Sequence, residues 1–272
     1  MYEHPLLAPE VNSPLLRQFL KVHGVDGIQS PVEMLTEVAR AFSRLPFENL
    51  TKIIKYAGAG RVEAARRTPG EVLGDHWKLG AGGTCFALTS AMLHLVRALG
   101  FQAEPILANR RYGDDTHSAL LVWIDGKPHL LDPGYLIVKP LPIPTAGEVR
   151  IATPFNQLIL RTQGGGAKVE LHTLQEKRTT YRLTFKAAPV DAGEFLRAWD
   201  ASFEADMMGY PVLSRLVGDQ QVYFQKKHLL IRGADQTKTS EVPPDRMIAE
   251  IARHFQIAPS VITEALVTLN HR

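Results

Sequence analysis

The sequence predicts an α+β fold in three consecutive parts, because the spacing of its apolar residues changes twice along the chain. Apolar residues recur at helical spacing up to about residue 100, and they alternate in short runs from 101 to about 200. From about residue 201 a strand pair is followed by at least one helix. A chain of 272 residues can bury about 75% of its unfolded surface, so it needs no disulfide to fold. We expect the parts 1–100, 101–200 and 201–272 to share interfaces.

Helix start and stop signals mark several helices in the first part. Ser13-Pro14 and Ser30-Pro31-Val32-Glu33 each place a capping serine before a proline, which is favoured at the first helical position. The second sequence is also a capping box, since its Glu follows its Ser by three residues. The apolar stretch from Cys85 to Leu99 predicts another helix, and Gly100 is placed to end it.

Short apolar runs separated by turn residues predict a small β-barrel or sandwich in the second part. The runs cover residues 103–108, 117–124, 129–132, 157–161, 168–174 and 180–186. Asp125-Gly126, between the second and third runs, is a strong signal for a two-residue hairpin. In the third part, Val222–Phe224 and Leu229–Ile231 predict a strand pair, and Pro243-Pro244-Asp245 predicts the start of a helix.

Composition favours a soluble, cytoplasmic protein that binds neither nucleic acid nor membrane. Cys85 is the only cysteine, so no disulfide can form within the chain, which fits a reducing cytosol. The N-terminus lacks a signal-peptide pattern, and no run approaches the roughly 18 apolar residues of a membrane span. The formal net charge is only +3, and short basic clusters such as Arg66-Arg67 fit solvated surface. No Cys/His cluster suggests zinc, so we expect no metal.

Cys85 has the sequence surroundings of a nucleophile. It follows Gly82-Gly83-Thr84 and occupies the first turn of a predicted helix, where the helix dipole favours thiolate over thiol. The two glycines allow close approach of backbone and leave N–H groups for a developing oxyanion. A lone cysteine is otherwise often a small buried apolar residue, so the assignment depends on its partners.

The predicted hairpin supplies those partners. A two-residue turn at Asp125-Gly126 sets a register in which Ala119 faces Asp132. His117 lies two residues from Ala119 on the same face, so it is a diagonal neighbour of Asp132, with Cβ atoms about 7–8 Å apart. A turn longer by one residue would place the two side chains on opposite faces.

Cys85, His117 and Asp132 are therefore a candidate nucleophile, general base and orienting acid. His117 would take the thiol proton and later relay protons to the leaving or attacking group. Asp132 would hold the imidazole in the required tautomer. This chemistry is acyl transfer through a thioester, and these residues alone name neither donor nor acceptor.

The residues around these three resemble the arylamine N-acetyltransferase family. The family motif Arg-Gly-Gly-x-Cys-x-Glu reads Ala-Gly-Gly-Thr-Cys-Phe-Ala at residues 81–87. Thr116-His117 precedes an apolar strand as in the family, and Leu131–Tyr135 is similar to the Asp-Val-Gly-Phe pattern. The family's Pro-Phe-Glu-Asn-Leu is intact at 46–50, and His254–Ile257 is similar to its Phe-Gly-Ile.

The resemblance implies a fold, a reaction and a set of substrates. The fold would comprise an N-terminal helical bundle, a central antiparallel β-barrel and a C-terminal α/β lid, with a cysteine-protease-like catalytic core. Acetyl-coenzyme A would acylate Cys85 in a ping-pong reaction, and an arylamine, arylhydroxylamine or hydrazine would collect the acyl group. We expect further ligand contacts from residues near these motifs: Gly134, Tyr135, Arg110 and Arg111 for coenzyme A, and Phe47 and Thr84 for the substrate.

Two positions depart from the family motif. Ala81 replaces its Arg and Ala87 replaces its Glu. The family's Arg is tied to the Pro-Phe-Glu-Asn-Leu segment, so Glu48 lacks that partner unless Arg44 or another base replaces it. A buried, unpaired carboxylate is costly.

These departures keep other functions open. One alternative is an amide synthase that releases a bound polyketide or peptide chain. Another is a thiol hydrolase of transglutaminase-like or papain-like character, since the same three residues can serve water as acceptor. A catalytically silent scaffold that only binds ligands would retain the fold but not an activated thiol.

Overall fold

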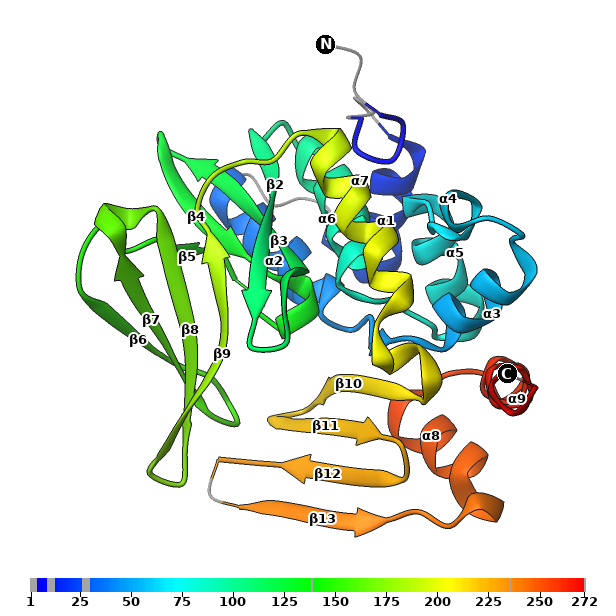
Figure 1. Ribbon diagram of the computed structural model, residues 1–272. Coiled ribbons are helices and arrows are strands. Elements are labelled where there is room, and N and C mark those ends of the chain that lie inside the picture. The colour runs from blue at the N-terminus through cyan, green and yellow to red at the C-terminus, as the bar shows by residue number, and fades with distance from the viewer. Residues whose placement is uncertain (1–3, 9–12, 26–29, 138, 235, 272) are drawn as a thin grey trace.

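The computed structural model describes residues 4–8, 13–25, 30–137, 139–234 and 236–271. The chain forms a mixed α/β fold with helices, a large curled sheet and a smaller sheet. Figure 1 shows the curled sheet on the left, the N-terminal helices on the right and the smaller sheet below them.

Three of the N-terminal helices, those that begin at Pro14, Pro31 and Cys85, start where the sequence predicts. The N-terminal helices are α1 (Pro14–His23), α2 (Pro31–Phe42), α3 (Leu50–Gly58), α4 (Val62–Ala65), α5 (Pro69–Leu79) and α6 (Cys85–Ala98). Ser13 accepts a hydrogen bond from Leu15 N, and Ser30 accepts one from Glu33 N. The start of α5 was not anticipated, although Thr68 and Glu71 form a reciprocal capping box there.

Eight antiparallel strands form the large sheet in the order β5-β4-β3-β2-β9-β8-β7-β6. Their bounds are β2 (Ala103–Arg110), β3 (Gly113–Ile124), β4 (Lys127–Leu131), β5 (Leu141–Pro142), β6 (Glu148–Ala152), β7 (Gln157–Gln163), β8 (Lys168–Gln175) and β9 (Arg178–Lys186). All six apolar runs lie on strands, whereas β5 and β6 were not predicted. Because β5 and β6 end the order, the expected barrel is an open, curled half-barrel.

The smaller sheet joins distant parts of the sequence. Its order is β1 (Phe47–Glu48), β10 (Val212–Val217), β11 (Gln220–Gln225), β12 (His228–Arg232) and β13 (Thr237–Glu241). Strand β1 comes from the N-terminal part and pairs with β10 through Phe47 and Ser214. Helices α8 (Met247–Phe255) and α9 (Pro259–Asn270) follow this sheet, and α9 packs against α3. None of the described helices has the length and hydrophobicity that a transmembrane span requires.

Helix α7 (Ala192–Ala201) returns from the curled sheet to the N-terminal helices (Figure 1). Phe195 and Trp199 of α7 pack their rings on Phe86 of α6, with centroids 5.5 Å and 6.2 Å away. Helix α6 is thus buried between other helices and strands β2 and β3. Short 3-10 helices complete the fold at Pro133–Tyr135, Gly164–Gly166, Ser202–Glu204, Asp206–Gly209 and Pro244–Arg246.

Candidate active site

Cys85 is held at the start of α6 by a close crossing of two backbones. Gly83 N donates to Pro46 O at 3.3 Å, and Glu48 N donates to Gly83 O at 3.0 Å. A Cβ on Gly82 would lie 1.8 Å from Pro46 O, so only glycine fits this crossing. The Pro-Phe-Glu-Asn-Leu segment therefore packs directly against the loop that presents the thiol.

The β3–β4 hairpin has the predicted register. Leu120 pairs with Leu131, and the pairing continues to the turn at Asp125-Gly126, where both residues have positive φ. His117 Nε2 lies 2.7 Å from Asp132 Oδ2, and both side chains are fully buried. The hairpin thus brings together the two residues that sequence spacing had placed on one face.

The residues after Asp132 form a 3-10 turn over the thiol. The second carboxylate oxygen of Asp132 accepts from Tyr135 N at 2.9 Å, which caps that turn. A Cβ added to Gly134 would lie 3.0 Å from Cys85 Cβ and 3.1 Å from His117 Cε1. Gly134 therefore borders both reacting side chains, and its lack of a side chain lets them approach each other.

The electrostatics of the site favour an ion pair between Cys85 and His117. Burial raises the pKa of Cys85, but the hydrogen bond and charge of His117, with Arg110 and Lys52, lower that pKa to about 7. Burial lowers the pKa of His117, whereas Asp132 and Cys85 raise it to about 9. At neutral pH the thiolate and the imidazolium are both substantially populated.

The neighbouring arginines Arg110 and Arg111 point to different surroundings. Arg110 Nη2 lies 3.1 Å from Nδ1 of His117, while its Nη1 donates to Tyr112 Oη at 2.8 Å. Arg111 is exposed and stacks over the Tyr181 ring, 5.5 Å from its centroid. Arg110 thus belongs to the immediate surroundings of His117, as its position a few residues before that histidine in the sequence suggests, whereas Arg111 does not.

Three cations affect the pKa of Tyr135, and two of them, Arg182 and Arg232, were not predicted from the sequence. Burial raises the pKa of its phenol to about 12, against the lowering charges of Arg182, Arg110 and Arg232. Arg182 comes from β9 and Arg232 from β12, so the cations belong to both sheets. No local pattern could have shown this, because the two strands are separated by α7.

Phe47 and Thr84 also belong to the surroundings of Cys85: Thr84 is part of the loop of residues 81–84 that precedes it, here called the nucleophile loop, and Phe47 lies beside this loop. Phe47 forms a bridge with Gly83, and its side chain is buried in the core that surrounds α6. Thr84 is the residue before α6, and its carbonyl accepts from Leu88 N at 2.9 Å. Phe86 is wholly buried against α7, which makes it a core residue.

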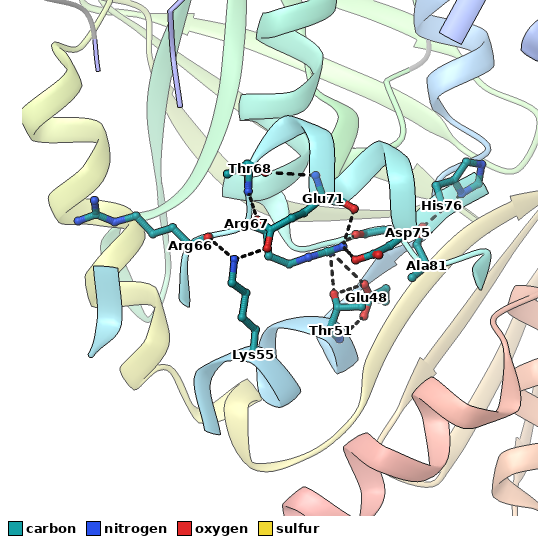
Figure 2. A network of polar contacts seen from close by, with 11 residues as sticks. Glu48, Thr51, Lys55, Arg66, Arg67, Thr68, Glu71, Asp75, His76 and Ala81 are labelled. Carbon is teal, nitrogen blue, oxygen red and sulfur yellow. Dashed lines mark hydrogen bonds and ion pairs between the residues drawn. The ribbon is translucent and has the colours of Figure 1, made fainter. Parts of the chain in front are cut away.

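Glu48 has a cationic partner, and it is Arg67 rather than Arg44 (Figure 2). The Glu48 carboxylate accepts from Thr51 N at 2.9 Å and lies 3.8 Å from Arg67 Nη1. The same Arg67 nitrogen donates to Gly82 O and to Thr51 Oγ1. Arg44 instead lies 3.4 Å from His23 Nδ1.

Arg67 therefore lies near positions 81 and 87, the two positions at which this chain departs from the family motif. Its Nη2 donates to Asp75 at 2.6 Å, and its side chain is only 4% exposed. A Cβ on Gly83 would meet Ala87 Cβ at 3.2 Å and Arg67 Nη1 at 3.4 Å. The expectation that Arg66-Arg67 is solvated surface is wrong for both residues. The loop before α5 turns the Arg67 guanidinium inward, and Arg66, with a side chain only 11% exposed, is paired with Asp200.

Lys52 is a second buried cation that the sequence did not reveal. Its Nζ donates to Ser202 O at 2.8 Å and Ser202 Oγ at 2.6 Å, and lies 4.1 Å from the Phe203 ring centroid. Burial lowers the pKa of Lys52 to about 8, while the charge of Cys85 raises it. The amine is thus largely charged at neutral pH. Among the described residues, no group of three or more His, Cys, Asp or Glu side chains could hold a metal ion.

Comparison with known proteins assigns this fold and site to a class. A family model described as N-acetyltransferase matches residues 31–258. No curated protein matches the chain in a search by sequence. Many solved structures match it, and those compared below are arylamine N-acetyltransferases. The chain belongs to the arylamine N-acetyltransferase family, since the model match covers most of its length.

The solved structures share the fold at low sequence identity. The enzyme of Mycobacterium abscessus is 20% identical, with a TM-score of 0.79 over 94% of this chain and 95% of that one. The Nocardia farcinica enzyme is 18% identical, with a TM-score of 0.79 over 100% of both chains. A Bacillus cereus enzyme with a Cys-His-Glu triad is 17% identical, with a TM-score of 0.70 over 90% and 99%.

Proposed function

We propose that this protein transfers an acetyl or other short acyl group from acyl-coenzyme A to an arylamine, arylhydroxylamine or hydrazine. The reaction would proceed by a ping-pong mechanism through a thioester on Cys85. One observation carries the proposal: the Cys85 thiol has its pKa lowered to about 7 by a His117 that is itself bonded to Asp132. Membership of the family supports the choice of donor and acceptor.

In the first half-reaction the Cys85 thiolate attacks the carbonyl carbon of the donor thioester. The tetrahedral intermediate collapses with cleavage of the bond to the coenzyme A sulfur, and His117 protonates that leaving thiolate. Asp132 keeps the imidazole oriented and stabilises its positive charge. The backbone N–H groups at the start of α6 are candidates for stabilising the oxyanion.

In the second half-reaction the acceptor amine attacks the acyl-Cys85 carbonyl. His117 is then neutral and removes the proton from the attacking nitrogen. The intermediate collapses with departure of the Cys85 thiolate, which restores the resting ion pair with imidazolium. The amide product and the starting state of the protein are obtained together, as a ping-pong scheme requires.

The remaining predicted ligand contacts divide between the two substrates. Gly134 borders the sulfur and would face the pantetheine end of the donor, while Tyr135 lies among cations suited to its phosphates. Arg111, Arg182 and Arg232 are the cations that we assign to this role. Phe47 and Thr84, on either side of the nucleophile loop, would border the acyl group and the acceptor.

Intact-mass measurement tests this proposal. Acetyl-coenzyme A should add one acetyl group to the wild-type chain and none to Cys85→Ala, and an arylamine should then remove it and become acetylated. Absence of an adduct would refute acyl transfer through Cys85. Equal release with and without amine would identify a hydrolase instead, and an adduct that persists with every amine would favour an amide synthase with another acceptor.

A further inference from the structure

Arg110 lies next to the atom through which His117 exchanges a proton with Cys85. His117 Nε2 is bonded to Asp132, so Nδ1 is the ring nitrogen left for the thiol. Arg110 Nη2 lies 3.1 Å from that same Nδ1. The guanidinium is therefore one hydrogen-bond length from the reacting pair, and an acyl group on the sulfur would lie within its reach.

The hydrogen bond from Arg110 to His117 can form only while Nδ1 of His117 carries no proton. A guanidinium has donors and no acceptor, so it can donate to Nδ1 only while that nitrogen carries no proton. Once Nδ1 has taken the thiol proton, the contact is lost and the guanidinium must face another acceptor. Nη1 keeps its contacts with Tyr112 Oη and Thr116 O, so the freed N–H on Nη2 can donate to the sulfur or to a group attached to it.

Arg110 has no carboxylate partner of its own among the residues that the structure describes. Its hydrogen-bond contacts are Tyr112 Oη, Thr116 O and His117 Nδ1, none of which carries a negative charge in its ordinary state. Burial lowers the pKa of Arg110, whereas the charge of Cys85 is the foremost influence that raises it. Asp132 is already engaged by His117 and by Tyr135 N.

The charges around the sulfur sum to a net positive charge, which favours the binding of one more anion. Before acylation the Cys85 thiolate and the Asp132 carboxylate are outnumbered by the cations that act on this pair of groups: His117, Arg110 and Lys52, whose amine is held by Ser202. This leaves one positive charge in excess. Acetylation removes the negative charge of the thiolate and the proton of His117 together, so the excess persists. A carboxylate on the acyl group would neutralise it, and guanidinium matches carboxylate by paired hydrogen bonds.

We propose that the preferred acyl donor carries a terminal carboxylate, as in malonyl- or succinyl-coenzyme A, and that Arg110 binds this carboxylate. The inference rests on the proposed function and names the acyl class that the function left open. The chemistry is unchanged: Cys85 thiolate attacks the thioester carbonyl, the bond to the coenzyme A sulfur breaks, and the leaving thiolate takes the proton from His117. The terminal carboxylate passes through the reaction intact.

Single-turnover acylation with matched donors tests the proposal. Malonyl- should be compared with propionyl-coenzyme A, and succinyl- with butyryl-coenzyme A, because each pair matches in chain length and differs in charge. We expect at least one dicarboxylic donor to acylate wild-type protein about tenfold faster than its neutral match, which corresponds to about 1.4 kcal/mol. Equal rates within both pairs would overturn the inference.

The Arg110→Gln variant shows whether the guanidinium is responsible. Its ratio of dicarboxylic to neutral rates should fall to about one, while Arg110→Lys, which keeps the charge but not the paired donors, should retain part of the preference. Arg178→Gln, at an exposed arginine at the start of β9, is the matched control and should keep the wild-type ratio. An unchanged ratio in Arg110→Gln, with folding verified by circular dichroism, would contradict the proposal.

Two further outcomes distinguish failure of this inference from failure of the proposed function on which it rests. If no donor forms an adduct on Cys85, the proposed function itself fails. If acetyl- and propionyl-coenzyme A form adducts and the dicarboxylic donors show no advantage, only this inference fails.

A steady-state comparison of 4-aminobenzoate with 4-aminobenzamide as acceptors completes the design. An effect of Arg110→Gln confined to 4-aminobenzoate would assign the carboxylate to the acceptor and overturn the proposal.

Discussion

At the scale of single residues, the lowered pKa of Cys85 comes from charges on three separate elements. His117 lies on β3, Lys52 lies on α3, and Arg110 lies at the end of β2. Burial alone would favour the neutral thiol, so the hydrogen bond and the three cations must outweigh it. The balance of these opposing effects is a thiol pKa of about 7.

Alkylation of Cys85 should therefore report an ionised thiol near neutral pH. The iodoacetamide rate should fall as pH drops through about 7, because protonation converts thiolate to thiol, and should level off above that pH. In His117→Ala the midpoint should move upward, because both the hydrogen bond and the positive charge are lost. Rate measurements from pH 5 to 10 give the midpoints.

A free small-molecule thiol measured in parallel provides the control for intrinsic reagent chemistry. A wild-type midpoint at the ordinary cysteine value near 8.5 would contradict the ion pair and would favour a scaffold without catalysis. The prior formation of an acyl adduct should block alkylation, which ties the reactive group to the sulfur of Cys85.

Gly134 determines how closely Cys85 and His117 meet. The Gly134→Ala substitution would place a Cβ about 3 Å from both side chains, so one of them must shift by a few tenths of an ångström. We expect acylation to slow roughly tenfold with little change in thermal stability, since small misplacements of reacting groups are costly to rate. Stopped-flow acylation and a thermal melt measure the two effects.

A half-buried glycine with open space around its Cβ position provides the comparison. Gly74→Ala on α5 meets no neighbour within 4 Å and should leave acylation unchanged. If Gly134→Ala acylated as fast as Gly74→Ala, the approach of Cys85 and His117 would not depend on the missing side chain.

At the scale of elements, the loop before α6 is held by contacts from two other segments. Strand β1 bonds to Gly83, and the loop between α4 and α5 sends Arg67 to Gly82 O. Figure 2 shows Arg67 lying between Glu48 and Thr51 on one side and Asp75 on the other. The guanidinium thus connects the nucleophile loop, α3 and α5, although position 81 carries no charge.

Removing Arg67 should loosen the nucleophile loop. Arg67→Ala leaves Glu48 buried beside an empty space, and loss of one member of a buried ion pair typically costs about 3–5 kcal/mol. We expect a matching loss in the free energy of unfolding and an upward shift in the pH midpoint of Cys85 alkylation. Urea unfolding and the alkylation profile measure these effects.

Restoring an arginine at position 81, where the family motif has one, tests whether Arg67 positions the nucleophile loop or only stabilises the fold. In Arg67→Ala/Ala81→Arg we expect partial recovery of the alkylation midpoint, because the new guanidinium can approach Glu48 from the other side of Gly82. In the wild-type background, Ala81→Arg alone should lower the free energy of unfolding, since it adds a second buried cation. If the double variant recovered neither property, Arg67 would be no substitute for the motif arginine.

At the scale of the whole molecule, cations from both sheets act on Tyr135. Arg182 projects from the half-barrel and Arg232 from the smaller sheet, and each lowers the pKa of the Tyr135 phenol. The positive charge of Arg182 also lowers the pKa of Arg232, after the larger effect of burial. Such an arrangement suits the phosphates of a coenzyme A donor.

Donor binding should consequently depend on salt. The KM for acyl-coenzyme A should rise as ionic strength increases from 0.01 to 0.5 M, because screening weakens attraction between phosphates and surface cations. The turnover number should change little, since the site beside Cys85 is buried. Steady-state kinetics with an acyl donor truncated to N-acetylcysteamine, which has no phosphate, should show no comparable salt effect. An equal salt effect on both donors would place the phosphates elsewhere.

Local patterns in the sequence were sufficient for the hairpin and for the three central side chains. The turn at Asp125-Gly126 sets the strand register, and register decides which residues share a face. The capping signals before α1 and α2 likewise act over a few residues. By contrast, the short strands β5 and β6 carry weak alternation, so an open half-barrel was not distinguished from a barrel or sandwich.

The sequence by itself determined the nucleophile loop, the hairpin and the helix that presents Cys85, because each depends on neighbouring residues or on one turn. Only the tertiary structure decided that Arg67 supports the loop, that Arg110 lies beside His117, that Lys52 helps to lower the pKa of Cys85, and that β1 joins β10. These contacts link segments whose separation leaves no periodic signal. The sequence around a long Arg or Lys side chain does not show whether its charged end lies in solvent or beside a buried partner.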